Sequence, residues 1–374
     1  MGDVPALRIP ASAVVFSVAP IDDARLNPSI SIKVEEQMKP AVGSRQKAGS
    51  RKLLGLFAWL IVVTMCFAFT ATAQEMAAHH HLDSSSEAMQ GNTQQRQDWA
   101  RARLAKSPRH QEWVDVKYGN RTVKSFVVYP EVKNKATAVV VIHEIFGMSD
   151  WVQALTDELA EAGYIAIAPD LLSGMGPNGR GTEELAASNG VGQAIGKLPP
   201  DQITADLNAV ADYVSKLPAA NGKVAVGGFC WGGSQSFRFA TNRPSLKAAF
   251  VFYGSAPSTP PPDSKTDKAA LEKIKAPVYG FYAGNDARIG ATVPPTTDAM
   301  KELKKTYDIV TYEGAGHGFM RAGDAPPPQS PAATGRETDK TAMESYGKNL
   351  TNYQANKKAR DQAWVSWKAI LAKL

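Results

Sequence analysis

The chain has 374 residues, of which 44% are hydrophobic and 21% are charged. This length fits one large domain or two small ones, and the composition excludes a wholly disordered or collagen-like chain. Residues 1–73 hold 8 Lys and Arg against 5 Asp and Glu, which is half of the net charge of +6. The remaining residues are therefore only mildly basic, and we expect no nucleic-acid partner.

Residues 53–73 form an uncharged run of 21 residues that ends in Ala71-Thr72-Ala73. Five basic residues lie just before the run, and no acidic residue occurs between residues 38 and 74. This pattern predicts a signal peptide over residues 38–73 and export to the periplasm or the medium. The run is also long enough to cross a bilayer, so an uncleaved membrane anchor is the alternative. We expect a membrane partner only in that second case.

The segments around this leader show no pattern typical of a folded domain. Residues 1–37 lack clear periodicity, and we interpret them as a disordered extension or as untranslated sequence before a start at Met38. Residues 74–108 are polar and are predicted to be a flexible linker. Three adjacent histidines at 79–81 lie in this linker. Three neighbouring side chains on a flexible arm converge poorly, so we expect no metal site there.

Residues 109–374 alternate apolar strand patterns with helical ones. Two alternating segments around Gly119-Asn120 predict an opening hairpin, and residues 138–142 are continuously apolar, as expected of a strand buried on both faces. The predicted strands are 112–118, 122–129, 138–142, 164–169, 223–229, 247–253, 277–282 and 308–312, and the main predicted helices are 149–162, 203–217, a helix ending near 242, 297–305 and much of 340–374. Strands that alternate with helices indicate an α/β fold with a mostly parallel central sheet flanked by helices and an antiparallel edge.

A candidate nucleophile follows the strand at 223–229. The sequence Gly-Phe-Cys-Trp-Gly-Gly at 228–233 matches the strand–turn–helix pattern G-x-S-x-G with Cys230 in place of serine. Small residues two before and two after the nucleophile leave room for the sharp turn. The thiol would project at a helix N-terminus, where we expect the peptide dipoles to favour the thiolate. A buried structural cysteine is the alternative interpretation.

Two further residues complete a triad in chain order. Asp286 follows the strand at 277–282, and His317 follows the strand at 308–312. The order nucleophile, acid, histidine is that of α/β-hydrolases, and all three residues follow strand ends, where open α/β sheets place their sites. We expect His317 to take the thiol proton or pair with the thiolate, and Asp286 to orient the imidazole. The backbone N–H groups of Trp231 and Ile145 would form the oxyanion hole.

Three motifs together resemble the dienelactone hydrolase family: His-Glu-Ile-Phe-Gly at 143–147, the cysteine elbow at 228–233, and Gly-Ala-Gly-His-Gly-Phe at 314–319. The resemblance extends from about residue 112 to the C-terminus. It implies a single α/β-hydrolase domain without a large lid and without a metal or organic cofactor. It also implies hydrolysis of a small-molecule carboxylic ester or lactone.

The resemblance also suggests residues around the triad. Glu144 matches a family glutamate that pairs with the cysteine until substrate arrives, and Arg321 matches an arginine that binds the substrate carboxylate. The second family arginine is missing from its place after Pro169-Asp170-Leu171, and Arg180 is the candidate substitute. Tyr253, at the end of the strand at 247–253, is expected to point into the pocket. We interpret His143 as a packing residue and not as a base.

Other functions of the same scaffold stay open from the sequence alone. A thioesterase or a peptidase could use the same acyl-enzyme. A redox-responsive protein that has lost efficient catalysis is a further alternative, because Cys230 would be a solitary thiol once a leader containing Cys66 is removed. We expect a monomer.

Overall fold

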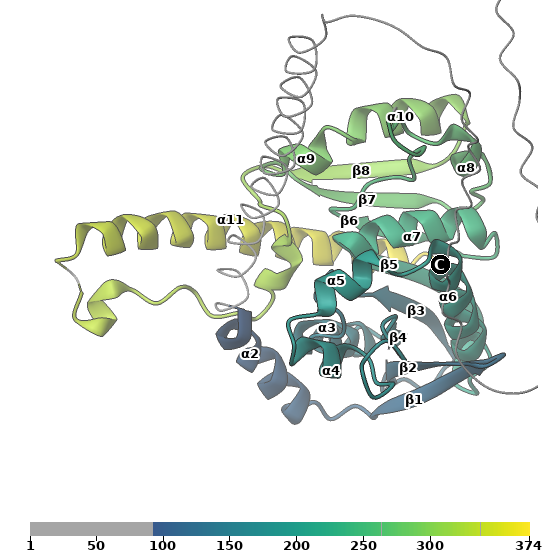
Figure 1. Cartoon of the computed structure of the whole chain (residues 1–374), viewed down its shortest axis with the longest axis horizontal. Helices are drawn as coiled ribbons and strands as arrows, with labels where there is room; N and C mark the ends of the chain where they lie inside the picture. Colours follow the sequence, from purple (N-terminus) through teal and green to yellow (C-terminus); the bar gives the residue numbers. More distant parts are fainter. Residues whose placement is uncertain (1–92, 263, 337) are drawn as a thin grey trace, which may run out of the picture. The chain divides into compact units, whose positions relative to one another are not determined.

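A single eight-stranded sheet organises the protein (Figure 1). The computed structural model describes residues 93–374, apart from residues 263 and 337. The strands are β1 (Gln111–Tyr118), β2 (Arg121–Val128), β3 (Ala136–Ile142), β4 (Ile165–Pro169), β5 (Ala220–Phe229), β6 (Ala249–Phe252), β7 (Val278–Ala283) and β8 (Tyr307–Tyr312). Their order is β1-β2-β4-β3-β5-β6-β7-β8; β2 is antiparallel to both its neighbours, and the remaining pairs are parallel.

Helices cover both faces of the sheet. The helices are α2 (Thr93–Lys106), α3 (Asp150–Glu161), α4 (Thr182–Ala186), α5 (Val191–Gly196), α6 (Pro200–Ser215), α7 (Trp231–Asn242), α8 (Lys268–Glu272), α9 (Ala287–Gly290), α10 (Val293–Glu302) and α11 (Lys340–Leu371), with short 3-10 helices η1 (Phe319–Ala322) and η2 (Pro331–Thr334). Helices α3 and α11 pack on one face, and α6, α7, α8 and α10 pack on the other. This architecture is the α/β-hydrolase fold, as the sequence predicted.

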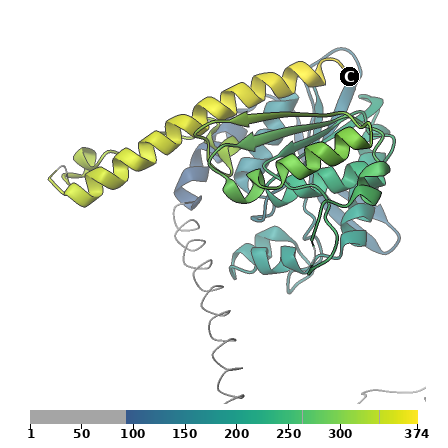
Figure 2. The same ribbon diagram turned by 90° about the horizontal axis from the view of Figure 1, so that it is seen from above.

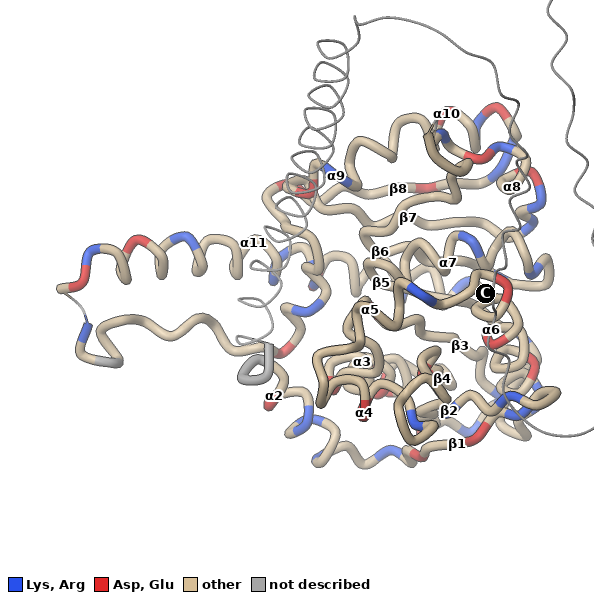
Figure 3. The backbone as a smooth tube through the Cα atoms, viewed as in Figure 1, with Lys and Arg blue, Asp and Glu red and all other residues tan. Residues whose placement is uncertain are grey.

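The central strands supply the core between these two layers. Figure 3 shows β3, β4, β6 and β7 without any lysine, arginine, aspartate or glutamate. All seven residues of β3 are buried, with Val140 and Ile142 in the cluster under α6 and α7, and Val139 and Val141 in the cluster under α3 and α11. A strand covered on both faces needs this continuous apolar sequence, which is why residues 138–142 were predictable.

The C-terminal helix α11 divides into two halves. Its buried residues, Ala359, Arg360, Ala363, Trp367 and Leu371, all lie in the second half. Figures 1 and 2 show the first half projecting beyond the sheet together with the segment that leads into it. Trp367 is fully buried against Phe229, Phe250 and Phe252 from the strands, so the second half anchors the helix to the core.

The start of the domain differs from the sequence prediction. Residues 93–106 form helix α2, which packs on α3, whereas the sequence predicted a flexible linker up to residue 108. The sequence of α2 has little amphipathic pattern. The helix is stabilised by tertiary contacts with α3, which local sequence does not reveal, so the prediction missed it. Helices α4 and α5 were not predicted either. The leader, the extension before it and the histidine triplet lie outside the described residues.

Within residues 93–374, as described, no helix is long and apolar enough to cross a membrane.

Candidate active site

The turn between β5 and α7 presents Cys230 in a strained backbone conformation. Cys230 has φ 56° and ψ −118°, and it begins α7 as its N-cap residue. Such positive φ values cost energy for a residue with a side chain. A Cβ atom at Gly228 would overlap the Gly232 carbonyl, and one at Gly232 would overlap the His143 carbonyl. The two glycines of the motif are therefore required by the close approach of backbone at this turn.

The protonation of the thiol differs from the sequence expectation. Burial and the neighbouring charge of Glu144 raise the pKa of the Cys230 thiol to about 11, against 9 for the unperturbed group. A hydrogen bond from the Trp231 backbone N–H and the charges of Arg321 and Arg288 oppose this shift. The helix N-terminus was expected to favour the thiolate, but desolvation and a nearby carboxylate outweigh it here. The resting group is a neutral thiol.

His317 and Asp286 form a close pair at the ends of β8 and β7. The His317 Nδ1 lies 2.5 Å from Asp286 Oδ2, so Nδ1–H donates to the carboxylate. The other oxygen, Oδ1, accepts a hydrogen bond from Ile289 N at the start of α9. The His317 Nε2 atom is buried and has no hydrogen-bond partner among the described residues. The imidazole is therefore held in one tautomer, with its basic nitrogen unused.

Glu144 is buried between Arg321 and Tyr253. Its Oε2 lies 3.4 Å from Arg321 Nε, and its Oε1 accepts a hydrogen bond of 3.2 Å from the Tyr253 hydroxyl. Burial and the charge of Glu144 raise the pKa of Tyr253 well above 10, so the hydroxyl stays protonated and donates. A buried carboxylate needs such partners. The same charge acts on the Cys230 thiol, so these four side chains form one electrostatic unit.

Tyr253 therefore occupies a different place from the one expected. The sequence suggested a side chain that lines the pocket, but Tyr253 is fully buried, with φ 42°. Its ring packs edge-on against His317, with 5.0 Å between the ring centroids. Tyr253 therefore supports Glu144 through its hydroxyl and the imidazole of His317 through its ring.

The two arginines named from the family pattern have different partners. The Arg321 guanidinium lies over the Phe146 ring, 5.3 Å from its centroid. Arg180 is exposed and pairs weakly with Glu183 and Glu184, at 3.8 and 4.0 Å. It lines a cavity of about 970 Å³ that Phe146 also borders. Phe146 thus lies where the surroundings of Arg321 meet this cavity.

Of the two backbone groups expected to form the oxyanion hole, one contacts the thiol in this structure. Trp231 N–H already points at the Cys230 sulfur. Ile145 is exposed, and within the described part of the chain its N–H takes part in no hydrogen bond. The loop before it is fixed by His143, whose Nδ1–H donates to the Glu144 carbonyl at 2.8 Å and whose Nε2 accepts from Leu171 N at 3.4 Å. Burial lowers the pKa of His143 and keeps it neutral, in agreement with a packing role.

Two further polar residues, which the sequence gave no reason to expect, hold the loops of the site in place. Thr182 Oγ1 donates to buried Asp170 Oδ1 at 2.8 Å and accepts from Met148 N at 3.1 Å, which ties the end of β4 to the loop that carries Glu144. Asn356 of α11 accepts a hydrogen bond of 2.7 Å from Gly316 N, next to His317. Each is a polar residue in an unremarkable sequence setting, so only the tertiary structure reveals its part. No cluster of metal-ligating side chains occurs among the described residues.

A comparison with protein families matches residues 123–374 to the model of the dienelactone hydrolase family. The chain belongs to this family. The match begins within β2 and covers every residue of the candidate site. It leaves helix α2 and strand β1 outside the matched region. The family is one of hydrolases, in keeping with the arrangement of Cys230, His317 and Asp286.

Curated relatives agree with this assignment. A protein of Methylorubrum extorquens, provisionally named a carboxymethylenebutenolidase, is 33% identical over 186 residues, which is 48% of this chain and 62% of that protein. The chain thus spans less than two thirds of that relative. A Saccharolobus solfataricus protein of the same provisional name is 30% identical over 233 residues, 53% of this chain and 84% of that protein. A Klebsiella pneumoniae crystal structure, provisionally titled a dienelactone hydrolase, aligns with 26% identity and a TM-score of 0.49 over 63% of this chain and 98% of that one.

Proposed function

We propose that this protein hydrolyses carboxylic esters or lactones through a covalent acyl-enzyme on Cys230. The observation that carries the proposal is that parallel strands β5, β7 and β8 end in a strained cysteine elbow, Asp286 and His317, with the His317 Nε2 free of any partner among the described residues. A nucleophile at such a turn, with a base oriented by a carboxylate, is the arrangement that acyl transfer needs.

The reaction follows from these groups in two halves. The Cys230 sulfur attacks the ester carbonyl carbon as its proton passes to His317 Nε2, and the carbonyl oxygen becomes an oxyanion facing the N–H groups of Ile145 and Trp231. The intermediate collapses and expels the alcohol, which takes the proton from His317. Water, deprotonated by His317, then attacks the thioester and releases the acid and the thiol. Asp286 stabilises the imidazolium formed in each half.

The neutral resting thiol fits this role. A buried thiol with a raised pKa resists oxidation and alkylation, because the thiolate is the reactive form. This disfavours the alternative of a redox-responsive protein. A thioesterase or a peptidase would use the same chemistry, and comparison of ester, thioester and peptide substrates with one acyl group would separate the three.

Replacement of the nucleophile tests the proposal. Cys230→Ala should lower the turnover of p-nitrophenyl acetate or of a dienelactone by at least about 10⁴-fold, as for other removed nucleophiles, with an unchanged melting temperature. Cys230→Ser should keep only weak activity, because the site suits sulfur. Rapid quenching of the wild type should reveal a mass increase of one acyl group on the Cys230 peptide. Unchanged turnover in the alanine variant would exclude Cys230 as the nucleophile.

We also propose that the protein is exported. The proposal rests on the basic stretch, the uncharged run at 53–73 and its Ala71-Thr72-Ala73 ending. N-terminal sequencing of the protein recovered from the periplasm or the medium should give a start close after residue 73. A full-length chain retained in the membrane would support the anchor instead.

A further inference from the structure

Helix α2 lies outside the region matched to the family, yet it contacts the loop that follows His317. The loop continues from His317 through η1, which contains Arg321, to Gly323 and Asp324. Two side chains of α2 reach its end. Arg103 donates a hydrogen bond of 2.9 Å from Nη1 to Asp324, and the Trp99 ring fills the space beside Gly323, 2.9 Å from where a Cβ would lie.

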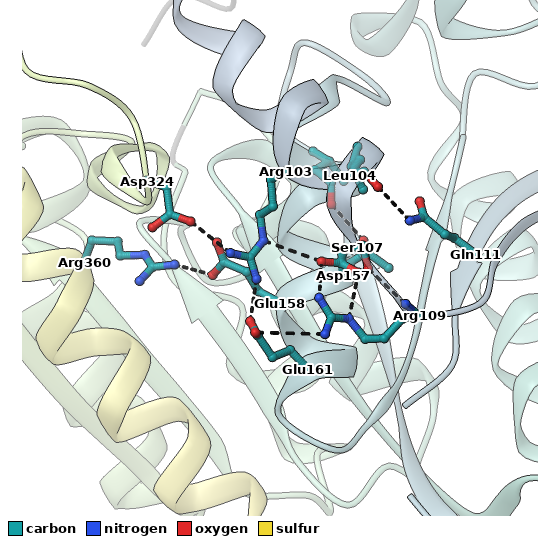
Figure 4. A network of polar contacts seen from close by, with 12 residues as sticks. Arg103, Leu104, Ser107, Arg109, Gln111, Asp157, Glu158, Glu161, Asp324 and Arg360 are labelled. Atoms are coloured by element: carbon teal, nitrogen blue, oxygen red, sulfur yellow. Dashed lines mark hydrogen bonds and ion pairs between the residues drawn. The ribbon is translucent and has the colours of Figure 1, made fainter. Parts of the chain in front are cut away.

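Arg103 joins this loop to α3 through a network of ion pairs. Figure 4 shows Arg103 between Asp324 and the carboxylates of α3. Its Nη2 lies 2.5 Å from Glu161, and its Nε lies 3.5 Å from Asp157. Asp157 is fully buried and is also held by Arg109, at 2.7 Å. Because α3 is packed against the sheet, Arg103 is anchored at one end and holds Asp324 at the other.

Helix α11 also packs against η1, and the η1 side chains of Phe319 and Met320 are buried. Helix α2 contacts the end of the loop, at Gly323 and Asp324. On its other side, α11 contributes the Tyr353 hydroxyl, which donates to the Ala325 carbonyl at 2.9 Å.

Arg321, which lies on this loop, has its Nε 3.4 Å from Glu144 Oε2. The charges of both residues act on the Cys230 thiol, so a shift of the loop would change the electrostatics at the thiol. Shifts of about 1 Å in positioning groups can cost as much as 100-fold in rate.

We propose that α2 is a positioning element of the active site: Trp99 and Arg103 hold Gly323 and Asp324, and so fix the guanidinium of Arg321. This inference rests on the proposed function for its kinetic consequences. It assigns to a helix outside the family region a part in substrate selection, because Arg321 is the cation that would meet an anionic substrate.

The test compares an anionic with a neutral ester in the full-length protein. Asp324→Asn should lower the ratio of kcat/KM for mono-p-nitrophenyl succinate to that for p-nitrophenyl acetate by about threefold, the size expected of one half-exposed charged contact. The loss should lie in KM for the anionic ester. The matched control is Asp98→Asn, which breaks an exposed ion pair between Asp98 and Arg101 within the same helix and should leave the ratio unchanged.

A second pair of variants tests the contact of Trp99 without altering charge. Gly323→Ala should overlap the Trp99 ring and lower the ratio by about tenfold, and adding Trp99→Leu should restore much of it by making room for the new methyl group. A purely structural role for α2 would lower turnover of both esters equally. Equal losses, or no rescue in the double variant, would overturn the proposal.

Hydrogen exchange separates a failure of this inference from a failure of the proposed function. Asp324→Asn should speed amide exchange in residues 318–325 relative to Asp98→Asn, whether or not the protein cleaves esters. If the wild type cleaves neither ester, the hydrolase proposal fails and exchange alone decides the inference. Unchanged protection of residues 318–325 would show that α2 does not hold this loop.

Discussion

The charge of Glu144 should control the reactivity of the nucleophile. Burial and this charge together raise the pKa of Cys230 to about 11, so roughly one molecule in 10³ carries the thiolate at pH 8. The rise of this pKa from 9 to about 11 makes ionisation of the thiol less favourable by about 3 kcal/mol. Glu144→Gln removes the repelling charge and frees Arg321, whose charge favours the thiolate. Both effects lower the pKa of the thiol.

Burial is the larger cause of the raised pKa of Cys230, and it persists in the Glu144→Gln variant. We therefore expect the pKa of the thiol to fall by only about one. The rate of alkylation by iodoacetamide at pH 8 should then rise about tenfold, and the midpoint of its pH profile should move to lower pH. Peptide mass spectrometry reports on Cys230 apart from Cys66. Glu302→Gln, an exposed change in α10, is the matched control and should alkylate like the wild type. A rate equal to or below that of the wild type would refute the assigned role of Glu144.

Two further variants test the imidazole and the ion network. Asp286→Asn removes the carboxylate 2.5 Å from His317 and should lower kcat by roughly 10²- to 10⁴-fold, measured with p-nitrophenyl acetate, because the wrong tautomer becomes accessible; a loss below threefold would contradict a triad. Arg360→Met leaves Glu158 buried without its ion-pair partner. It should reduce the free energy of unfolding, measured by urea titration, by about 3 kcal/mol or more. Stability equal to the wild type would show that Arg103, whose charge also acts on Glu158, compensates.

The sequence predicts the sheet well because its strands carry their own signals. A strand buried on both faces must be continuously apolar, and β3 and β4 contain no charged residue at all. The hairpin turn at Gly119, with φ 50°, needs a residue tolerant of that conformation. Helix α2 carries no comparable signal, because charged contacts with α3 and the loop after η1, which lie far away in sequence, hold it in place.

The site divides in the same way. The turn at Cys230 and the positions of Asp286 and His317 after strand ends follow from local patterns. The protonation of the thiol does not, because it depends on how deeply Cys230 is buried and on a carboxylate from β3's end that tertiary packing brings near. The same reason explains Tyr253: a tyrosine at a strand end can face the pocket or the core, and its positive φ of 42°, which turns the backbone, cannot be read from its neighbours in sequence.

The charges around the thiol bear on the class of substrate. Arg321 and Arg288 are the cations whose charges act on Cys230, whereas Arg180 is engaged with Glu183 and Glu184 at the edge of the neighbouring cavity. Arg288 is exposed and forms no ion pair with another described residue. If the substrate is an anionic ester, we propose that Arg321 binds its carboxylate and that Arg288 is the second cation. Its carboxylate would compete with Glu144 for Arg321, so we expect the charge of the substrate to affect the protonation of Cys230 through this guanidinium.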